Sequence, residues 1–125
     1  MREQVAERAR YRCEYCRVPD EIWFRHHLDH ILPLKHGGHT TLENLAYACM
    51  TCNLNKGADY FVPGPAGEPV RLFNPRVQVW EDHFRVEGAL IMPLTGEGGA
   101  TVRVLRINDA LRIVQREGLR RLGLY

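Results

Sequence analysis

The 125-residue sequence has no apolar run of the roughly 18 residues or more that indicates a membrane-spanning helix. Its first segment, Met1–Arg12, is rich in arginine and glutamate and lacks the apolar stretch of a secretory signal peptide. Internal repeats and low-complexity segments are also absent. From these absences we expect a soluble, cytoplasmic protein with no membrane partner.

Neither sign of charge dominates the sequence. The 17 lysines and arginines face 15 aspartates and glutamates, which gives a formal net charge of +2 at pH 7. A net charge this small neither indicates nor excludes a nucleic-acid partner. The hydrophobic fraction of 45% is ordinary for a globular protein, and the length suits one domain over residues 1–125. A core of this size is modest, so a bound metal ion would add useful stability.

The four cysteines form two close pairs, Cys13-x-x-Cys16 and Cys49-x-x-Cys52. Disulfides are rare in cytoplasmic proteins, whereas two such knuckles can together supply the four thiolates of a tetrahedral zinc site. Because protein sulfurs would fill every coordination position, the predicted zinc site is structural. A redox dithiol, an iron site of the same geometry and free buried thiols are the alternatives.

Hydrophobic spacing in the first half of the chain predicts short helices and strands. The expected elements are a helix at residues 4–11, a strand at 22–32, a turn or loop at 35–39, a strand at 45–48 and a helix from 51 to about 56. Gly57 can end that last helix. The predicted zinc site would clamp the entry of the first strand onto the start of this helix.

The second half gives weaker local signals. Residues 62–69 contain three prolines and two glycines, so we predict a loop or a boundary between a core at 1–61 and an extension at 62–125. The Glu87-Gly88 pair between two apolar stretches predicts a tight hairpin.

The stretch 100–107 fits either a strand or a helix, and we favour a helix. A helical reading places five apolar residues on one face: Ala100, Val104, Ile107, Leu111 and Val114. Asp109 is then a candidate cap for a last helix. That helix carries four arginines, interpreted most simply as a solvated face that could also follow phosphates: Arg112, Arg116, Arg120 and Arg121.

A recognisable set of motifs lies between the two cysteine pairs. It consists of Asp29-His30-Ile31-Leu32-Pro33, Gly37-Gly38, Glu43-Asn44-Leu45 and Cys52-Asn53-Leu54-Asn55-Lys56-Gly57. These motifs resemble the HNH nuclease family, whose signature runs DH-I-x-P, GG, NL, CxxCN and KG. Parts of residues 72–108 also resemble the C-terminal extension of small stand-alone HNH proteins. The resemblance implies an α+β fold, in which a ββα-metal core stapled by the four-cysteine zinc site precedes a hairpin and helical extension.

The same resemblance implies an endonuclease that hydrolyses DNA phosphodiester bonds with one divalent cation. In such an enzyme His30 is the general base, and Asp29 and Asn53 hold Mg²⁺ or Mn²⁺. The residue types suit these roles, because a neutral imidazole accepts a proton near neutral pH and oxygen ligands suit hard cations. Asn44, by the same resemblance, bonds the backbone of the long loop and orients the segment that carries His30.

Three points stay open at the level of sequence. Neighbouring residues of a strand point to opposite faces, so the joint use of Asp29 and His30 calls for a twisted or bulged strand end. Lys56 is a candidate for a phosphate contact or merely the end of its helix, and His36 is a second candidate for such a contact. The sequence does not indicate an oligomeric state.

The main alternative function is a non-catalytic, zinc-stabilised DNA-binding module. Retention of all three of Asp29, His30 and Asn53 favours the enzyme, because a degenerate module would be expected to lose at least one of them. RNA is a further alternative substrate, since a single-metal site contacts the phosphate and not the sugar hydroxyl.

Overall fold

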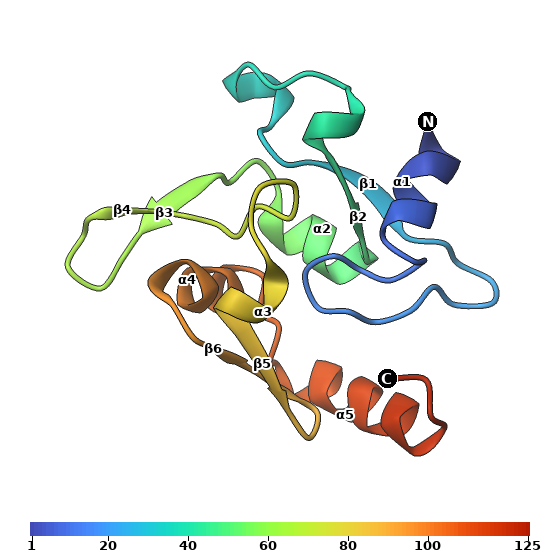
Figure 1. The fold of residues 1–125 in the computed structure, drawn as a ribbon. Coiled ribbons are helices and arrows are strands. Elements are labelled where there is room, and N and C mark those ends of the chain that lie inside the picture. The colour runs from blue at the N-terminus through green and yellow to red at the C-terminus, as the bar shows by residue number, and fades with distance from the viewer.

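A computed structural model describes all 125 residues as a mixture of short helices and three two-stranded antiparallel sheets (Figure 1). In chain order the elements are α1 (Arg2–Arg8), β1 (His27–His30), η1 (Leu34–His36), η2 (Leu42–Asn44), β2 (Leu45–Ala48), α2 (Met50–Lys56), β3 (Phe61–Pro63), β4 (Pro69–Arg71), α3 (Trp80–His83), β5 (Phe84–Glu87), β6 (Leu90–Pro93), α4 (Gly96–Val104) and α5 (Ala110–Arg121). This confirms the predicted α+β class. None of the helices combines the length and the apolar character that crossing a membrane would require.

Strands β1 and β2 and helix α2 form a ββα unit in the upper half of Figure 1. The strands pair in regular antiparallel register, from His27 opposite Ala48 to His30 opposite Leu45. All four residues of β2 are buried, because α1 covers one face of the strand and the main core covers the other. The predicted strand at 45–48 is confirmed, and the predicted helix begins one residue early, at Met50.

The predicted strand at 22–32 is wrong at residues 22–26 and at residues 31–32. Only residues 27–30 are paired, because β2 offers just four partners. Ile22 is 92% exposed, and the side chains of Trp23 and Phe24 are also in solvent, so no sheet face holds them. The carboxylate of Asp20 accepts a hydrogen bond from the backbone N–H of His26, which fixes the turn into β1.

The predicted loop at 62–69 is confirmed only for residues 64–68, which form the turn of a hairpin, whereas its ends belong to strands. Strands β3 and β4 pair antiparallel with Val62 opposite Val70. Two prolines, Pro63 and Pro69, face each other in the last strand pair. Neither has an N–H to donate, and the hairpin is closed beyond them by the N–H of Gly64, which donates to the carbonyl of Glu68. The hairpin predicted around Gly88 is confirmed as β5 and β6.

Helices α4 and α5 do not share the single apolar face that the spacing predicted. Helix α4 ends at Val104, and Arg106 has a left-handed backbone with φ of 54° that breaks the helical path. Because of this break α5 follows a new axis, so Leu111 is 84% exposed and Val114 is exposed as well.

Helix α5 also contradicts the predicted solvated arginine face at two of its four positions. Arg112 and Arg116 are buried, whereas Arg120 and Arg121 are exposed as expected. The guanidinium of Arg116 donates to the carbonyl oxygens of Ala89 and Ile107 at 2.7 and 2.8 Å. Hydrogen-bond acceptors inside the fold, rather than apolar residues, therefore set the rotation of this helix.

One apolar core joins the two halves of the chain. Its 18 buried residues include all four cysteines together with residues of the extension, such as Leu72, Phe73, Trp80 and Phe84. A smaller cluster lies between α1 and β2. Asp109 precedes α5 as predicted, but its side chain pairs with Arg106 instead of capping the helix.

Candidate functional site

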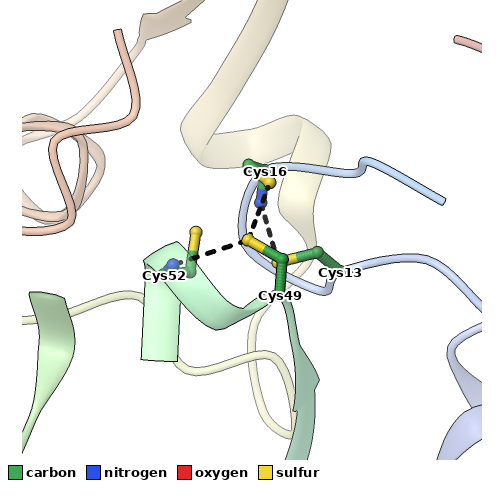
Figure 2. Close-up of side chains that lie close together, drawn as sticks. All are labelled: Cys13, Cys16, Cys49 and Cys52. Atoms are coloured by element: carbon green, nitrogen blue, oxygen red, sulfur yellow. Dashed lines mark hydrogen bonds between the residues drawn. The ribbon is translucent and has the colours of Figure 1, made fainter. Parts of the chain in front are cut away.

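The two cysteine pairs meet where β2 turns into α2 (Figure 2). Cys49 is the residue before α2, and its sulfur accepts the backbone N–H of Cys52 at 3.4 Å. In the first pair, the sulfur of Cys13 accepts the N–H of Cys16 at 3.5 Å in the same way. Each CxxC turn thus points one backbone donor at its own first sulfur.

The four sulfurs have the spacing of a metal site. All lie within 4.8 Å of one another, and the Cys16 and Cys49 sulfurs are 3.7 Å apart. A tetrahedron with metal–sulfur bonds of about 2.3 Å separates its sulfurs by about 3.8 Å. Burial raises the pKa of the Cys13 and Cys52 thiols, and a bound dication would favour the thiolates instead. The predicted ligands are therefore together and could hold a structural zinc ion.

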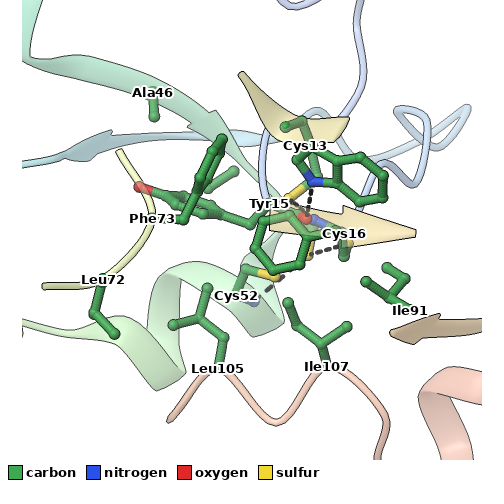
Figure 3. Close-up of a cluster of buried hydrophobic side chains, with 14 of the residues drawn as sticks. Cys13, Tyr15, Cys16, Ala46, Cys52, Leu72, Phe73, Ile91, Leu105 and Ile107 are labelled. Atoms are coloured by element: carbon green, nitrogen blue, oxygen red, sulfur yellow. Dashed lines mark hydrogen bonds between the residues drawn. The ribbon is translucent and has the colours of Figure 1, made fainter. Parts of the chain in front are cut away.

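Residues of the extension enclose the cysteines (Figure 3). Apolar side chains gather around the sulfurs, among them Leu72, Phe73, Ile91, Leu105 and Ile107. The indole N–H of Trp80 donates to the carbonyl of Tyr15 at 2.9 Å, and the hydroxyl of Tyr125 donates to that of Cys16 at 2.7 Å. The extension thereby satisfies polar backbone groups of the first knuckle as well as covering it.

A buried ionic cluster lies beside the cysteines. The hydroxyl of Tyr15, in the middle of the first knuckle, donates to Asp29 Oδ2 at 2.8 Å. The Lys56 ammonium lies 3.3 Å from Oδ1 and 3.2 Å from Oδ2 of the same carboxylate. Burial raises the pKa of Asp29, which is 3% exposed, while Lys56 and Tyr15 act in the opposite direction. Sequence reasoning missed Tyr15 because a residue between two metal ligands carries no motif of its own.

Lys56 does not reach outward to a phosphate, as one of the two sequence interpretations expected. The residue is 1% exposed, and its ammonium also donates to the carbonyls of His30 and Ile31 at 3.0 and 3.2 Å. The last turn of α2 packs against the end of β1, so the lysine reaches inward to these acceptors. Its role in this structure is to hold the end of β1 to α2.

His30 is half-buried at the last position of β1. Its Nε2 atom lies 2.9 Å from the Thr40 hydroxyl, within hydrogen-bond distance. When that hydroxyl accepts from Nε2–H, Nδ1 is the unprotonated nitrogen and can act as a base. No pattern in the sequence singled out Thr40, because its contact with His30 depends on how the intervening loop folds.

Asn44 makes the loop contacts that the family resemblance implied. Its side chain accepts from the N–H of Leu32 and donates to the carbonyls of Leu32 and His39, each at 2.9 Å. Gly38 allows this closure, since a Cβ there would lie 1.8 Å from the Leu32 carbonyl oxygen. The amide side chain of Asn44 therefore helps to close the loop between β1 and β2, together with the backbone bond from the N–H of Ile31 to the carbonyl of Asn44.

One pocket brings three of the predicted catalytic residues together. Asp29, His30 and Asn53 line this cavity of about 280 Å³ between the end of β1 and α2. The sequence called for a twisted or bulged strand end, and the regular strand pairing contains no bulge. Asp29 and His30 nevertheless both border the pocket, where His30 is the last residue of β1. Lys35 also lines the pocket and is exposed, whereas the predicted His36 is exposed but lies outside its lining.

Comparison with protein-family models matches residues 13–59 to the family described as HNH endonuclease. Residues 13–59 are therefore similar to an HNH domain. The match spans both cysteine pairs and the whole pocket. No curated protein and no solved structure matches the chain in the corresponding searches.

The oxygen donors of the pocket suit a hard divalent cation by their chemistry. Mg²⁺ and Mn²⁺ are bound in proteins by a few carboxylate or amide oxygens and keep several waters. A carboxylate offers about four lone-pair positions, and Tyr15 and Lys56 do not use all of those on Asp29. Asn53 is half-buried on the facing helix and contributes an amide oxygen to the donor set. A cation held here would share the Asp29 carboxylate with Lys56.

Proposed function

We propose that the protein is a metal-dependent endonuclease that hydrolyses DNA phosphodiester bonds at the pocket lined by Asp29, His30 and Asn53. The observation that carries this proposal is the shared pocket, which combines a base and oxygen donors for a cation. The HNH family match supports the reaction class and the nucleic-acid substrate.

In this proposal His30 takes a proton from the attacking water through Nδ1. Thr40 holds the opposite nitrogen, and Asn44 keeps the loop that carries Thr40 in place. Asp29 and Asn53 would hold Mg²⁺ or Mn²⁺, which when bound stabilises the negative charge that develops on the phosphate. Lys35 and His36 are both exposed and are the candidates for contacts to the DNA backbone.

Incubation of purified protein with supercoiled plasmid tests the proposal directly. We expect nicked or linear DNA in the presence of Mg²⁺ or Mn²⁺, and intact plasmid when a chelator removes the free divalent cation. Binding of DNA without cleavage at any cation concentration would favour the alternative, a zinc-stabilised DNA-binding module. Cleavage of RNA under the same conditions would widen the substrate class.

Replacement of the proposed base tests the mechanism. His30→Ala should reduce the cleavage rate by about 10²–10⁴-fold, the usual contribution of a general base. DNA affinity should change little, because phosphate contacts by lysine and arginine dominate it. His27→Ala is the matched control, since His27 lies on the same strand but is exposed and outside the pocket. Wild-type cleavage by His30→Ala would end the proposed mechanism.

A further inference from the structure

Helix α5 presents a charged side chain to the cysteine cluster. Although α5 lies outside the region that matches the HNH family, Arg112 in its first turn is only 8% exposed. Leu111 and Val114 on the same helix are in solvent. An amphipathic helix normally buries its apolar residues, so the interior must contain something that a guanidinium stabilises.

That partner is the pair of sulfurs at the start of α2. The Nη2 atom of Arg112 lies 3.0 Å from the Cys52 sulfur and 3.6 Å from the Cys49 sulfur. Its Nη1 atom donates to the carbonyl of Leu105, just after α4, at 2.6 Å. One guanidinium thus connects both ligands of the second knuckle to the junction between α4 and α5.

Charge explains why a cation belongs there. Four thiolates around a Zn²⁺ ion carry a net charge of about −2. The four cysteines are almost completely buried, and buried charge is costly unless an opposite charge and hydrogen bonds accompany it. The backbone donors of Cys16 and Cys52 are neutral, whereas Arg112 brings a full positive charge into contact with sulfur.

Arg116 gives a useful contrast, since it lies one helical turn further along α5 and is fully buried. Its guanidinium donates to the carbonyl oxygens of Ala89 and Ile107 and to the side-chain oxygen of Asn108. Arg116 is therefore a structural arginine without a sulfur contact. A comparison of Arg112 and Arg116 variants therefore distinguishes the loss of any buried guanidinium from the loss of the contact with the metal ligands.

We infer that Arg112 is an outer partner of the zinc site, by which the C-terminal extension neutralises the thiolate cluster and slows metal release. Hydrogen bonds to ligand sulfurs hold those ligands in orientation, and losing such an outer partner typically costs about 10–100-fold in metal affinity. The extension is then part of the metal site and not only a cover over it.

Zinc transfer from the full-length, zinc-loaded protein to a chromogenic chelator tests this inference. Arg112→Gln should release zinc at least about 10-fold faster than the wild type, at a temperature where every variant is folded. Arg116→Gln should lower the melting temperature yet release zinc at close to the wild-type rate. Arg112→Lys keeps the charge and should restore slow release in part.

A second measurement tests directly the contact between Arg112 and the cysteine sulfurs. In cobalt-substituted protein, the thiolate-to-metal charge-transfer band should move in Arg112→Gln and stay in place in Arg116→Gln. If Arg112→Gln fails to fold, the same comparison is made between Arg112→Lys and Arg116→Lys. Equal zinc release from the Arg112 and Arg116 variants, or an unchanged rate in Arg112→Gln, would overturn the inference.

Discussion

Residues 13–59 and residues 62–125 share one apolar core but use their polar side chains differently. In the first segment many polar contacts stay inside the segment, as when Asn44 closes the loop between β1 and β2, although Asn55 also donates across to the carbonyl of Leu105. In the second segment several key contacts reach across to the first, as when Trp80 and Arg112 contact the two knuckles. The difference indicates that the first segment organises itself around the cysteines, and that the extension takes its position from that framework.

Loss of a metal ligand should have the largest effect. Cys13→Ser should abolish zinc binding and unfold both segments, because the cysteines and the apolar residues of the extension form one cluster. Structural zinc contributes about 10–16 kcal/mol in small zinc-binding peptides, which is comparable with the whole stability of a domain. Metal analysis and the near-ultraviolet circular dichroism of Trp80 provide the measurement. A native Trp80 signal in zinc-free protein would show that the contact between the two segments forms without zinc.

The second-largest effect on stability is expected when the contact of Trp80 with the first segment is removed. Trp80→Ala deletes a buried indole and its hydrogen bond to Tyr15, and we expect a loss of about 3–5 kcal/mol in the free energy of unfolding. Denaturant unfolding measures the loss. The neighbouring Val79 is exposed, so Val79→Ala serves as the control and should change stability little. Equal losses in the two variants would contradict the packing described here.

A smaller effect is expected inside the first segment. Asn44→Ala leaves backbone groups of the long loop without partners, and this should cost about 1–3 kcal/mol and also reduce cleavage. The zinc content should stay at the wild-type value, because the loop lies away from the cysteines. Glu43→Ala, at an exposed neighbouring position, is the control. An unchanged melting temperature in Asn44→Ala would show that the loop is held by other contacts.

The smallest effect tests the orientation of α5. Leu111→Gln should change stability by no more than about 0.5 kcal/mol, because the leucine is in solvent. The matched variant Ile107→Gln places a polar group in the core and should be strongly destabilising. Thermal unfolding of both proteins gives the comparison. A large loss of stability in Leu111→Gln would instead indicate that Leu111 lies on the buried apolar face that the sequence pattern predicted.

Local patterns predicted much of residues 13–59. The spacing of the cysteines indicated the metal site, and the strand at 45–48 and the helix after it follow from short-range preferences. Family resemblance supplied the proposed roles of Asp29, His30 and Asn53, and the structure places these three residues around one pocket. The exception is Lys56, whose inward direction depends on contacts with β1 that no local pattern contains.

The sequence by itself determined the chemistry available to this protein, because candidate metal ligands, a candidate histidine base and oxygen donors are properties of residue types and their spacing. Only the tertiary structure decided which face of α5 is buried and where β1 begins. Periodicity in the sequence records which residues are apolar, and it predicted Leu111 inside and Arg112 outside. A cluster of buried sulfurs and carbonyl oxygens reverses that arrangement, since it stabilises a guanidinium more than it would a leucine.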